Sequence, residues 1–294
     1  MLDLRRLRLL CELDRRGTIA AVAAALHYAP SGVSQQLAQL ETEAGVPLLE
    51  RVGRNVRLTD AAKALAAHAE AVLGRLEAAE AELATFAGEA RGVVRIAAFQ
   101  TAAVALVPAA LAALARYEGL RVEVVQAEPE AALPALSARD HDLVLGEEYP
   151  GFPAPVVPEL DREPLCTDPM RLARAARTGT LPDAAGDVWV MEPPGTVAHA
   201  WALAQCRAAG FEPDVRHLAS DMSVHLELVR QGLASAFLPE MAWHGRPAPP
   251  GSRRLAGQAR AITTTVRRGG AAHPAIRLVR DALRAAAREI DQPE

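Results

Sequence analysis

The chain has 294 residues and a formal net charge of −4 at pH 7; half of the residues are hydrophobic and 23% are charged. This length allows one large or two smaller domains, and the negative charge excludes a uniformly basic nucleic-acid-binding protein but not a local basic patch. The sequence has no apolar run of about 18 residues and no long apolar core near its N-terminus, so we expect a soluble protein with no membrane partner. The three cysteines lack metal-ligand spacing, which is typical of a reducing, cytoplasmic compartment.

The first thirty residues predict two helices. Leucine recurs every third residue in segment 4–16, and Gly17 ends the run, which predicts a helix with one apolar stripe. Thr18 is placed to cap a short second helix. Pro30 suits the first turn of a third helix, although Ala29 before it is a poor cap.

The third helix contains the stretch SGVSQQLAQLE, residues 31–41. Val33, Leu37 and Leu40 form one buried stripe at helical spacing. The opposite face carries hydroxyls and amides, with Gln36 at its edge: Ser31, Ser34, Gln35, Ala38 and Gln39. Such groups donate and accept hydrogen bonds as base edges in the major groove do, so we predict a DNA-reading helix. A merely solvated polar face is the alternative for this helix taken alone.

Residues 48–59, LLERVGRNVRLT, alternate in polarity around Gly53, which predicts a short β-hairpin. The hairpin carries Arg51, Arg54 and Arg57, and each of these arginines is able to neutralise one phosphate.

These motifs together resemble a known family. The segment GTIAAVAAALHYAPSGVSQQLAQLETEAGVPLLERVGRNVRLTDAA resembles the winged helix-turn-helix of LysR-type transcriptional regulators. The resemblance implies DNA contacts from Pro30, Ser31, Ser34, Gln35 and Gln36 and from the three hairpin arginines. The helical geometry adds Gln39 to the DNA-facing set. Ala29 departs from the family, which usually has a capping Ser or Thr there.

Residues 60–88 predict a long helix with a heptad seam at spacing 4-3-4-3-4-3. The seam consists of Leu65, Ala69, Val72, Leu76, Ala79, Leu83 and Phe86. We interpret it as a dimerisation helix that sets the distance between two DNA-reading heads; packing on its own domain is the alternative. A two-fold dimer would present its recognition helices to an inverted repeat with whole-turn spacing.

After residues 90–93, strand-like and helix-like runs alternate, which predicts an open parallel sheet with helices on both faces. A second similar set follows. The two sets resemble the bilobal type-2 periplasmic-binding-protein fold of LysR effector domains, with two Rossmann-like subdomains. The expected protein is therefore multi-domain: an all-α winged helix-turn-helix head (1–59), a linker helix (60–89) and an α/β effector-binding domain (90–294). Subdomain I takes 93–163 and 267–294, and subdomain II takes 164–266.

Ligands of open α/β sheets bind beyond the carboxyl ends of the strands. We therefore expect effector contacts from Phe99, Gln100, Thr101, Glu147, Glu148, Thr196, Asp221, Met222 and Ser223. Thr101 and Ser223 either cap their helices or help to hold a ligand carboxylate. Glu147 and Glu148 either favour a cationic or amine-bearing effector or belong to a solvated loop.

No reaction centre is evident. The motifs HExxH, GxSxG, GxxxxGK and GxGxxG are absent and the eight histidines are scattered, so we expect no enzyme, no metal and no cofactor. His225 at the expected cleft is either a packed or exposed histidine or a proton-sensitive contact. A redox switch between Cys166 and Cys206 is an alternative that no neighbouring group supports.

The resulting hypothesis is a regulator that binds promoter DNA as a dimer or a dimer of dimers and responds to a small-molecule effector. RNA polymerase is a further candidate partner. The alternative is a small-molecule binding module with a weak or vestigial DNA head.

Overall fold

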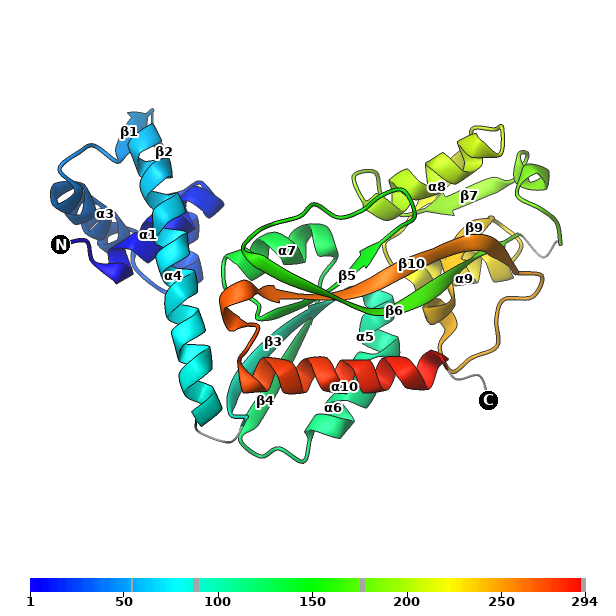
Figure 1. Ribbon diagram of the computed structural model, residues 1–294. Helices are drawn as coiled ribbons and strands as arrows, with labels where there is room; N and C mark the ends of the chain where they lie inside the picture. The colour runs from blue at the N-terminus through cyan, green and yellow to red at the C-terminus, as the bar shows by residue number, and fades with distance from the viewer. Residues whose placement is uncertain (54, 87–89, 175–177, 292–294) are drawn as a thin grey trace. The chain divides into compact units, whose positions relative to one another are not determined.

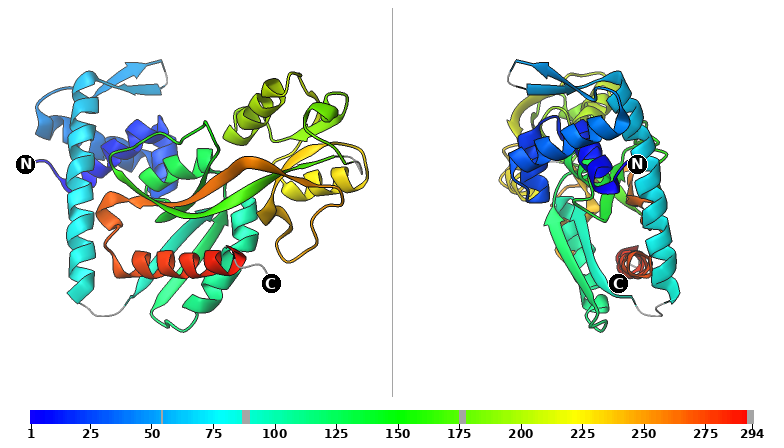
Figure 2. Two further views of the ribbon diagram at one scale, coloured as in Figure 1. Left: turned by 45° about the vertical axis from the view of Figure 1, so that its right-hand side comes forward. Right: turned by 90° about the vertical axis from the view of Figure 1, so that its left-hand side faces the viewer.

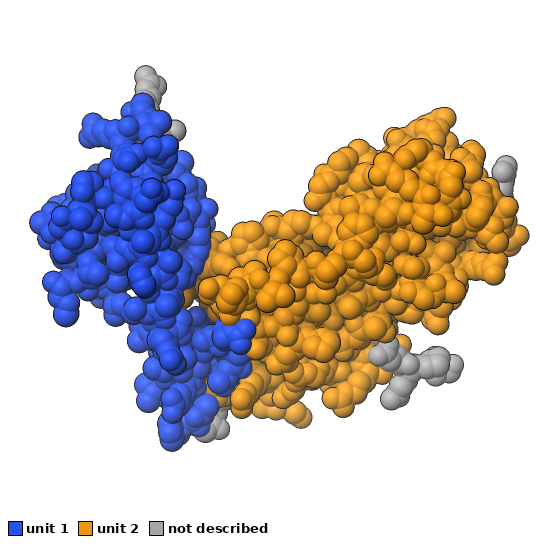
Figure 3. All heavy atoms as spheres, turned by 45° about the horizontal axis from the view of Figure 1, so that its top comes forward, with its two compact units in different colours: residues 1–88, 268–273 blue, residues 89–267, 274–294 orange. Residues whose placement is uncertain are grey.

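The computed structural model describes residues 1–53, 55–86, 90–174 and 178–291 and divides into two compact units (Figures 1 and 3). Unit 1 contains residues 1–88 and 268–273, and unit 2 contains residues 89–267 and 274–294. Within the described part of the chain, no helix is both long and apolar enough to cross a bilayer.

Unit 1 is a small helical domain with a two-stranded hairpin and one long helix. Its elements are α1 (Leu4–Arg16), α2 (Ile19–Leu26), α3 (Pro30–Ala44), β1 (Leu49–Val52), β2 (Asn55–Leu58), α4 (Asp60–Phe86) and the 3-10 turn η3 (Arg268–Gly270). Gly17 ends α1 at a positive φ of 74°, a conformation that glycine adopts without strain. The Thr18 side chain caps α2 as predicted, by accepting the Ala21 N–H at 3.1 Å. Ala29 gives α3 no side-chain cap.

The core of unit 1 forms between α1, α2, α3 and the first turns of α4. The predicted stripe Val33, Leu37 and Leu40 is at most 1% exposed. The charged Glu12 is also fully buried, and it pairs with Arg15 at 3.2 Å and Arg16 at 2.6 Å on the same helix. A buried carboxylate of this kind is tolerable because its charge is matched.

Unit 2 combines a mixed six-stranded sheet with a separate pair of strands. Its strands are β3 (Gly92–Ala98), β4 (Leu120–Gln126), β5 (Leu143–Glu148), β6 (Leu160–Ala173), β7 (Val188–Met191), β8 (Asp214–Leu218), β9 (Ala236–Pro239) and β10 (Arg253–Arg267). Its helices are α5 (Gln100–Ala105), α6 (Val107–Leu114), α7 (Pro129–Ser137), α8 (Val197–Ala208), α9 (Met222–Arg230) and α10 (Pro274–Asp291), with 3-10 turns η1 (Pro182–Ala184) and η2 (Glu240–Trp243).

The strand order of the large sheet is β4-β3-β5-β10-β6-β9, and β7 pairs with β8 in parallel. The long antiparallel pair β6 and β10 runs through the whole unit (Figure 2). Helix α7 covers one face of the sheet, while α6 and α10 cover the other (Figure 1). Around β7 and α8, the rings of Trp189, Trp201 and Phe237 pack with centroids 5.0–5.2 Å apart.

The sheet differs from the predicted parallel arrangement. Strands β3, β4 and β5 are parallel as expected, but β10 is antiparallel to both β5 and β6. Strand β6 was missed because Pro164 and Pro169 make its sequence resemble a loop. Residues 160–169 of β6 pair with β10 alone in the described sheet, so one side of this part of the strand needs no N–H donors. The helix-like run over residues 102–117 is divided at Leu106 into α5 and α6, two residues before Pro108.

Candidate functional sites

The outward face of α3 is built as the sequence predicts. The predicted contact residues Pro30, Ser31, Ser34, Gln35, Gln36 and Gln39 are all exposed. Two of them already have intramolecular bonds, since Gln36 accepts from Arg6 Nε at 2.9 Å and the Ser34 hydroxyl donates to the Pro30 carbonyl at 3.1 Å. Gln35 and Gln39 have no hydrogen-bond partner in the described part of the chain, so their amides are available to an external partner.

The hairpin β1–β2 extends the same unit. Glu50 lies opposite Arg57 and Arg51 lies opposite Val56, so Arg51 and Arg57 point to opposite faces of the ribbon. Arg57 pairs with Glu50 at 2.8 Å, although its side chain is 70% exposed. Arg51 is exposed as well. The third predicted arginine, Arg54, lies outside the described residues.

The predicted seam of α4 is buried at its N-terminal end and exposed at its C-terminal end. Ala69 is 1% exposed inside the core of unit 1, and Leu65 is half-buried against that core. The remaining seam residues are exposed, the large ones at 47% for Val72, 44% for Leu76, 68% for Leu83 and 80% for Phe86. An apolar row at heptad spacing is therefore accessible on the C-terminal half of α4, beyond the part that packs on the head.

In unit 2, a buried arginine brings several predicted effector residues together. Arg260 of β10 is 3% exposed and pairs with Glu147 and, at 2.7 Å, with Asp168. It donates to the Thr101 hydroxyl at 2.5 Å, and its guanidinium carbon lies 5.0 Å from the centre of the Phe99 ring. Sequence reasoning missed Arg260 and Asp168. The available signal was an arginine inside the apolar strand ARAITTTV, because a buried arginine needs matched carboxylates.

A second group of predicted residues joins the start of α5 to the start of α9. The Gln100 side chain donates to Asp221 and accepts the backbone N–H of Met222 at 2.6 Å. Asp221 also accepts the Ser223 N–H at 2.8 Å. Backbone N–H groups at the start of a helix attract anions when they have no partner. At the start of α9, those of Met222 and Ser223 already donate to the protein's own side chains.

The two glutamates predicted either to favour a cationic effector or to lie in a solvated loop are both paired with arginines. Glu147 pairs with Arg260, and Glu148 pairs with Arg162 at 2.9 Å. Both negative charges are therefore already matched within unit 2. The spacing of these residues in the sequence did not predict either ion pair. The Thr196 hydroxyl accepts the His199 N–H at 3.1 Å and donates to the Pro193 carbonyl, so it caps α8.

The environment of Arg260 contains more acid than base. Burial, together with the negative charge of Glu147, raises the pKa of Glu128 to about 7 and that of Glu192 to about 8. Burial also raises the pKa of Glu147 itself, against the lowering effect of Arg260. For Arg260, burial lowers the pKa, but the charges of Glu147 and Asp168 outweigh it and leave the pKa well above its ordinary value. Several carboxyl groups therefore share one cation.

This acid excess predicts a stability that depends on pH. A carboxyl group whose pKa is raised on folding stabilises the protein below its unfolded pKa and loses that contribution as pH rises through the folded pKa. The unfolding free energy of unit 2 should therefore fall between about pH 5 and pH 9. The variant Glu192→Gln should match the parent at the acidic end and exceed it by about 1–3 kcal/mol at the alkaline end.

Urea unfolding followed by tryptophan fluorescence measures this effect, because Trp189, Trp201 and Trp243 all lie in unit 2. The control variant is Glu212→Gln, whose side chain is 68% exposed beside Arg207. Equal pH profiles for the parent and Glu192→Gln would show that Glu192 does not carry the effect.

The structure shows the environments of His225 and of the cysteines, for which proton-sensing and redox roles were the alternatives. His225 is 2% exposed and bonds through Nε2 to the Ala219 carbonyl at 2.7 Å, and burial lowers its pKa. None of the three cysteines forms a disulfide bond in the described part of the chain, and burial raises the pKa of Cys206 to about 12. A thiol with so high a pKa is a poor nucleophile at neutral pH, which weighs against a redox role.

Two family models match the chain. The LysR substrate binding domain matches residues 87–288, and the bacterial regulatory helix-turn-helix protein of the lysR family matches residues 4–63. The chain belongs to the LysR family. It is a DNA-binding transcriptional regulator with a helix-turn-helix head and an effector-binding domain, and the relatives that it matches are transcription regulators.

Individual relatives agree with this assignment. The regulator is 29% identical to the transcriptional dual regulator GltC of Bacillus subtilis over 243 residues, which is 81% of each chain. It is 32% identical to the regulator GbpR of Rhizobium radiobacter over 200 residues, which is 65% of this chain and 66% of that one.

Solved structures share the fold. A full-length OxyR variant from Pseudomonas aeruginosa superposes with a TM-score of 0.69 at 20% identity, covering 98% of this chain and 97% of that one. Full-length CbnR in complex with its target DNA superposes with a TM-score of 0.52 at 24% identity, covering 97% of this chain and all of that one.

Proposed function

We propose that this LysR-family regulator binds an inverted-repeat promoter site as a dimer or a dimer of dimers and that a small molecule in its effector domain changes the spacing of the two heads. The observation that carries this proposal is the α3 face, on which exposed amides and hydroxyls replace the charged residues usual on a solvated helix. Its buried stripe and its exposed polar face divide cleanly between core and surface.

Direct reading of bases falls to the free amides of α3. A glutamine pairs bidentately with adenine, and Gln35 and Gln39 have this capacity unused in the described part of the chain. Pro30, Ser31, Ser34 and Gln36 contribute positioning contacts beside them. Arg51, Arg54 and Arg57 of the hairpin contact phosphates, which adds affinity but no base preference.

Two heads are brought together by α4. The exposed row Val72, Leu76, Leu83 and Phe86 is the dimer seam in this proposal, while Leu65 packs partly on its own head. The chain then divides into a head (1–59), a linker helix (60–89) and an effector-binding domain (90–294), with subdomain I at 93–163 and 267–294 and subdomain II at 164–266.

The response to the effector involves the two clusters in unit 2. The Arg260 cluster includes Phe99, Thr101 and Glu147, and the other cluster joins Gln100 to Asp221 and Met222. These contacts connect elements from both proposed subdomains. A ligand that binds the rearranged form more tightly than the resting form would shift the angle between the subdomains, which is the requirement for allostery. Contact with RNA polymerase is a further part of the proposal.

The variant Gln35→Ala tests base reading. It should weaken binding to the cognate site by about 1–3 kcal/mol and relax the preference at one base position, with little change on random DNA. The measurement is a fluorescence-anisotropy titration on both duplexes at one fixed salt concentration, after selection of bound sequences from a random library.

The matched contrast is Arg51→Ala, which should weaken binding equally on both duplexes and reduce the salt slope by about 1. If Gln35→Ala also lost affinity equally on cognate and random DNA, Gln35 would not read a base.

A further inference from the structure

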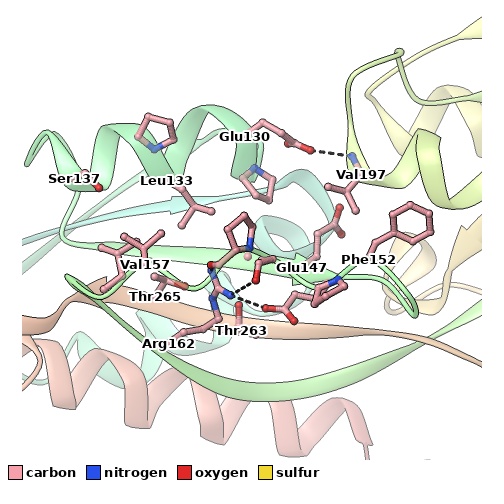
Figure 4. A pocket seen from close by; sticks show the side chains of 18 residues that line it. Glu130, Leu133, Ser137, Glu147, Phe152, Val157, Arg162, Val197, Thr263 and Thr265 are labelled. Carbon is pink, nitrogen blue, oxygen red and sulfur yellow. Dashed lines mark hydrogen bonds and ion pairs between the residues drawn. The ribbon is translucent and has the colours of Figure 1, made fainter. Parts of the chain in front are cut away.

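Unit 2 contains a pocket of about 520 Å³ on the α7 side of its sheet (Figure 4). Its walls include Leu133 of α7, Phe152 and Val157 of the segment between β5 and β6, and Val197 at the start of α8. The volume falls in the range of small-molecule sites, about 300–1,000 Å³. These apolar side chains suit the body of an apolar ligand.

The floor of the pocket offers an unused hydrogen-bonding group. Thr263 and Thr265 are alternate residues of β10, so both face the pocket. Thr265 is 1% exposed, and its Oγ1 has no hydrogen-bond partner in the described part of the chain. A buried hydroxyl without a partner costs about 1–3 kcal/mol, which a ligand with a suitable polar group would recover.

A glycine keeps this floor open. A Cβ atom added at Gly146, beside Thr263 on the neighbouring strand, would lie 3.1 Å from the Thr263 hydroxyl oxygen. Any larger residue would therefore press into the polar floor of the pocket.

The charges around the pocket are unbalanced toward acid. Glu147 pairs with Arg260 and Glu148 pairs with Arg162. Glu130 has no ion-pair partner in the described part of the chain, and its carboxylate accepts the Val197 N–H at 3.1 Å (Figure 4). The pocket therefore presents net negative charge, which favours a cation and disfavours a carboxylate.

We propose that this pocket binds a small apolar amine, with its ammonium group beside Glu130, its body against Leu133 and Phe152, and a second hydrogen-bonding group at Thr265. This inference names the ligand class of the effector domain and to that extent rests on the proposed function. Glu130 belongs to α7 and Val197 to α8, so the ligand contacts elements of both proposed subdomains. Of the predicted effector residues, Glu147 and Glu148 line this pocket.

Three probes with one ring and different head groups test the charge preference. They are tyramine, an amine; tyrosol, a neutral alcohol; and 4-hydroxyphenylacetate, a carboxylate. Isothermal titration calorimetry on the full chain should give about tenfold tighter binding for tyramine than for tyrosol and weaker binding still for the carboxylate.

Three variants test the location. Thr265→Val removes the hydroxyl at constant volume and should weaken the binding of tyramine about tenfold. Glu130→Gln should remove the preference for tyramine over tyrosol, and Leu133→Trp should abolish binding by filling the pocket. Glu212→Gln is the surface control, and unfolding followed by tryptophan fluorescence checks that each variant is folded.

Three results would overturn the inference: no binding of any probe up to about 10 mM, equal binding of the carboxylate and the amine, or retained binding in a folded Leu133→Trp variant. The same samples are titrated with the selected DNA site. If the parent shows no base-specific DNA binding, the proposed function is contradicted. If the parent binds DNA normally but the probes do not bind the pocket as expected, only this inference is contradicted.

Discussion

The Arg260→Met variant should lose about 3–5 kcal/mol of unfolding free energy in the effector domain at neutral pH. Removing the guanidinium leaves Glu147 and the 1%-exposed Asp168 buried without a cation, and an uncompensated buried charge is strongly destabilising. Methionine keeps most of the side-chain volume, so the loss reports mainly on charge. Urea unfolding followed by tryptophan fluorescence measures it.

The control for this variant is Arg253→Met, on the same strand at an exposed position, which should change stability by less than about 0.5 kcal/mol. Adding Glu147→Gln and Asp168→Asn to Arg260→Met should restore part of the loss, since the buried charges are then gone. A loss below about 1 kcal/mol in Arg260→Met would mean that water or neighbouring groups already screen these carboxylates.

The double variant Leu76→Glu with Leu83→Glu should break the proposed pairing of two subunits through α4. The two leucines are 44% and 68% exposed in a single chain, and an acidic pair on each helix would place like charges opposite one another in the seam. Light scattering should then show half the parent mass. Affinity for a two-half-site operator should fall by about a hundredfold or more, because binding of the second head is no longer intramolecular.

Ala67→Glu is the matched control, since Ala67 is exposed on α4 but lies away from the seam. It should leave both mass and operator affinity unchanged. An unchanged mass in the leucine variant would show that α4 is not the principal contact between subunits. Single-half-site DNA should bind the leucine variant and the parent with similar affinity, which separates loss of pairing from damage to the head.

In the effector domain, Arg260 forms buried ion pairs, but the carboxyl groups around it outnumber the arginines. Arg260 satisfies Glu147 and Asp168, but Glu128 and Glu192 keep pKa values of about 7 and about 8 because they are buried near the same negative charge. Protonation near neutrality and binding of a cation both relieve this repulsion. The expected pH dependence and the proposed preference for an amine therefore have one physical cause, an excess of carboxylates over arginines.

The head of this regulator could be predicted almost completely from its sequence. The stripe Val33, Leu37 and Leu40, the Thr18 cap and the hairpin around Gly53 depend on residues close together in the chain, and helical and strand periodicity is a local property. The heptad row on α4 is local as well. What periodicity could not show is that Ala69 serves the core of its own head while Leu76 and Leu83 stay exposed.

The effector domain could be predicted only in part from its sequence. Alternating apolar runs were enough to predict its α/β class, but β6 was hidden by its prolines, because whether a strand tolerates them depends on how many neighbours it has. The pairing of Glu147 with Arg260 joins residues 113 positions apart, and that of Gln100 with Asp221 joins residues 121 apart. Whether a carboxylate is free or matched depends on which distant residues the sheet brings beside it. The sequence by itself determined the elements of the head and most of those of the effector domain, because periodicity is a local property. The tertiary structure decided which strands pair and which charges remain for a ligand.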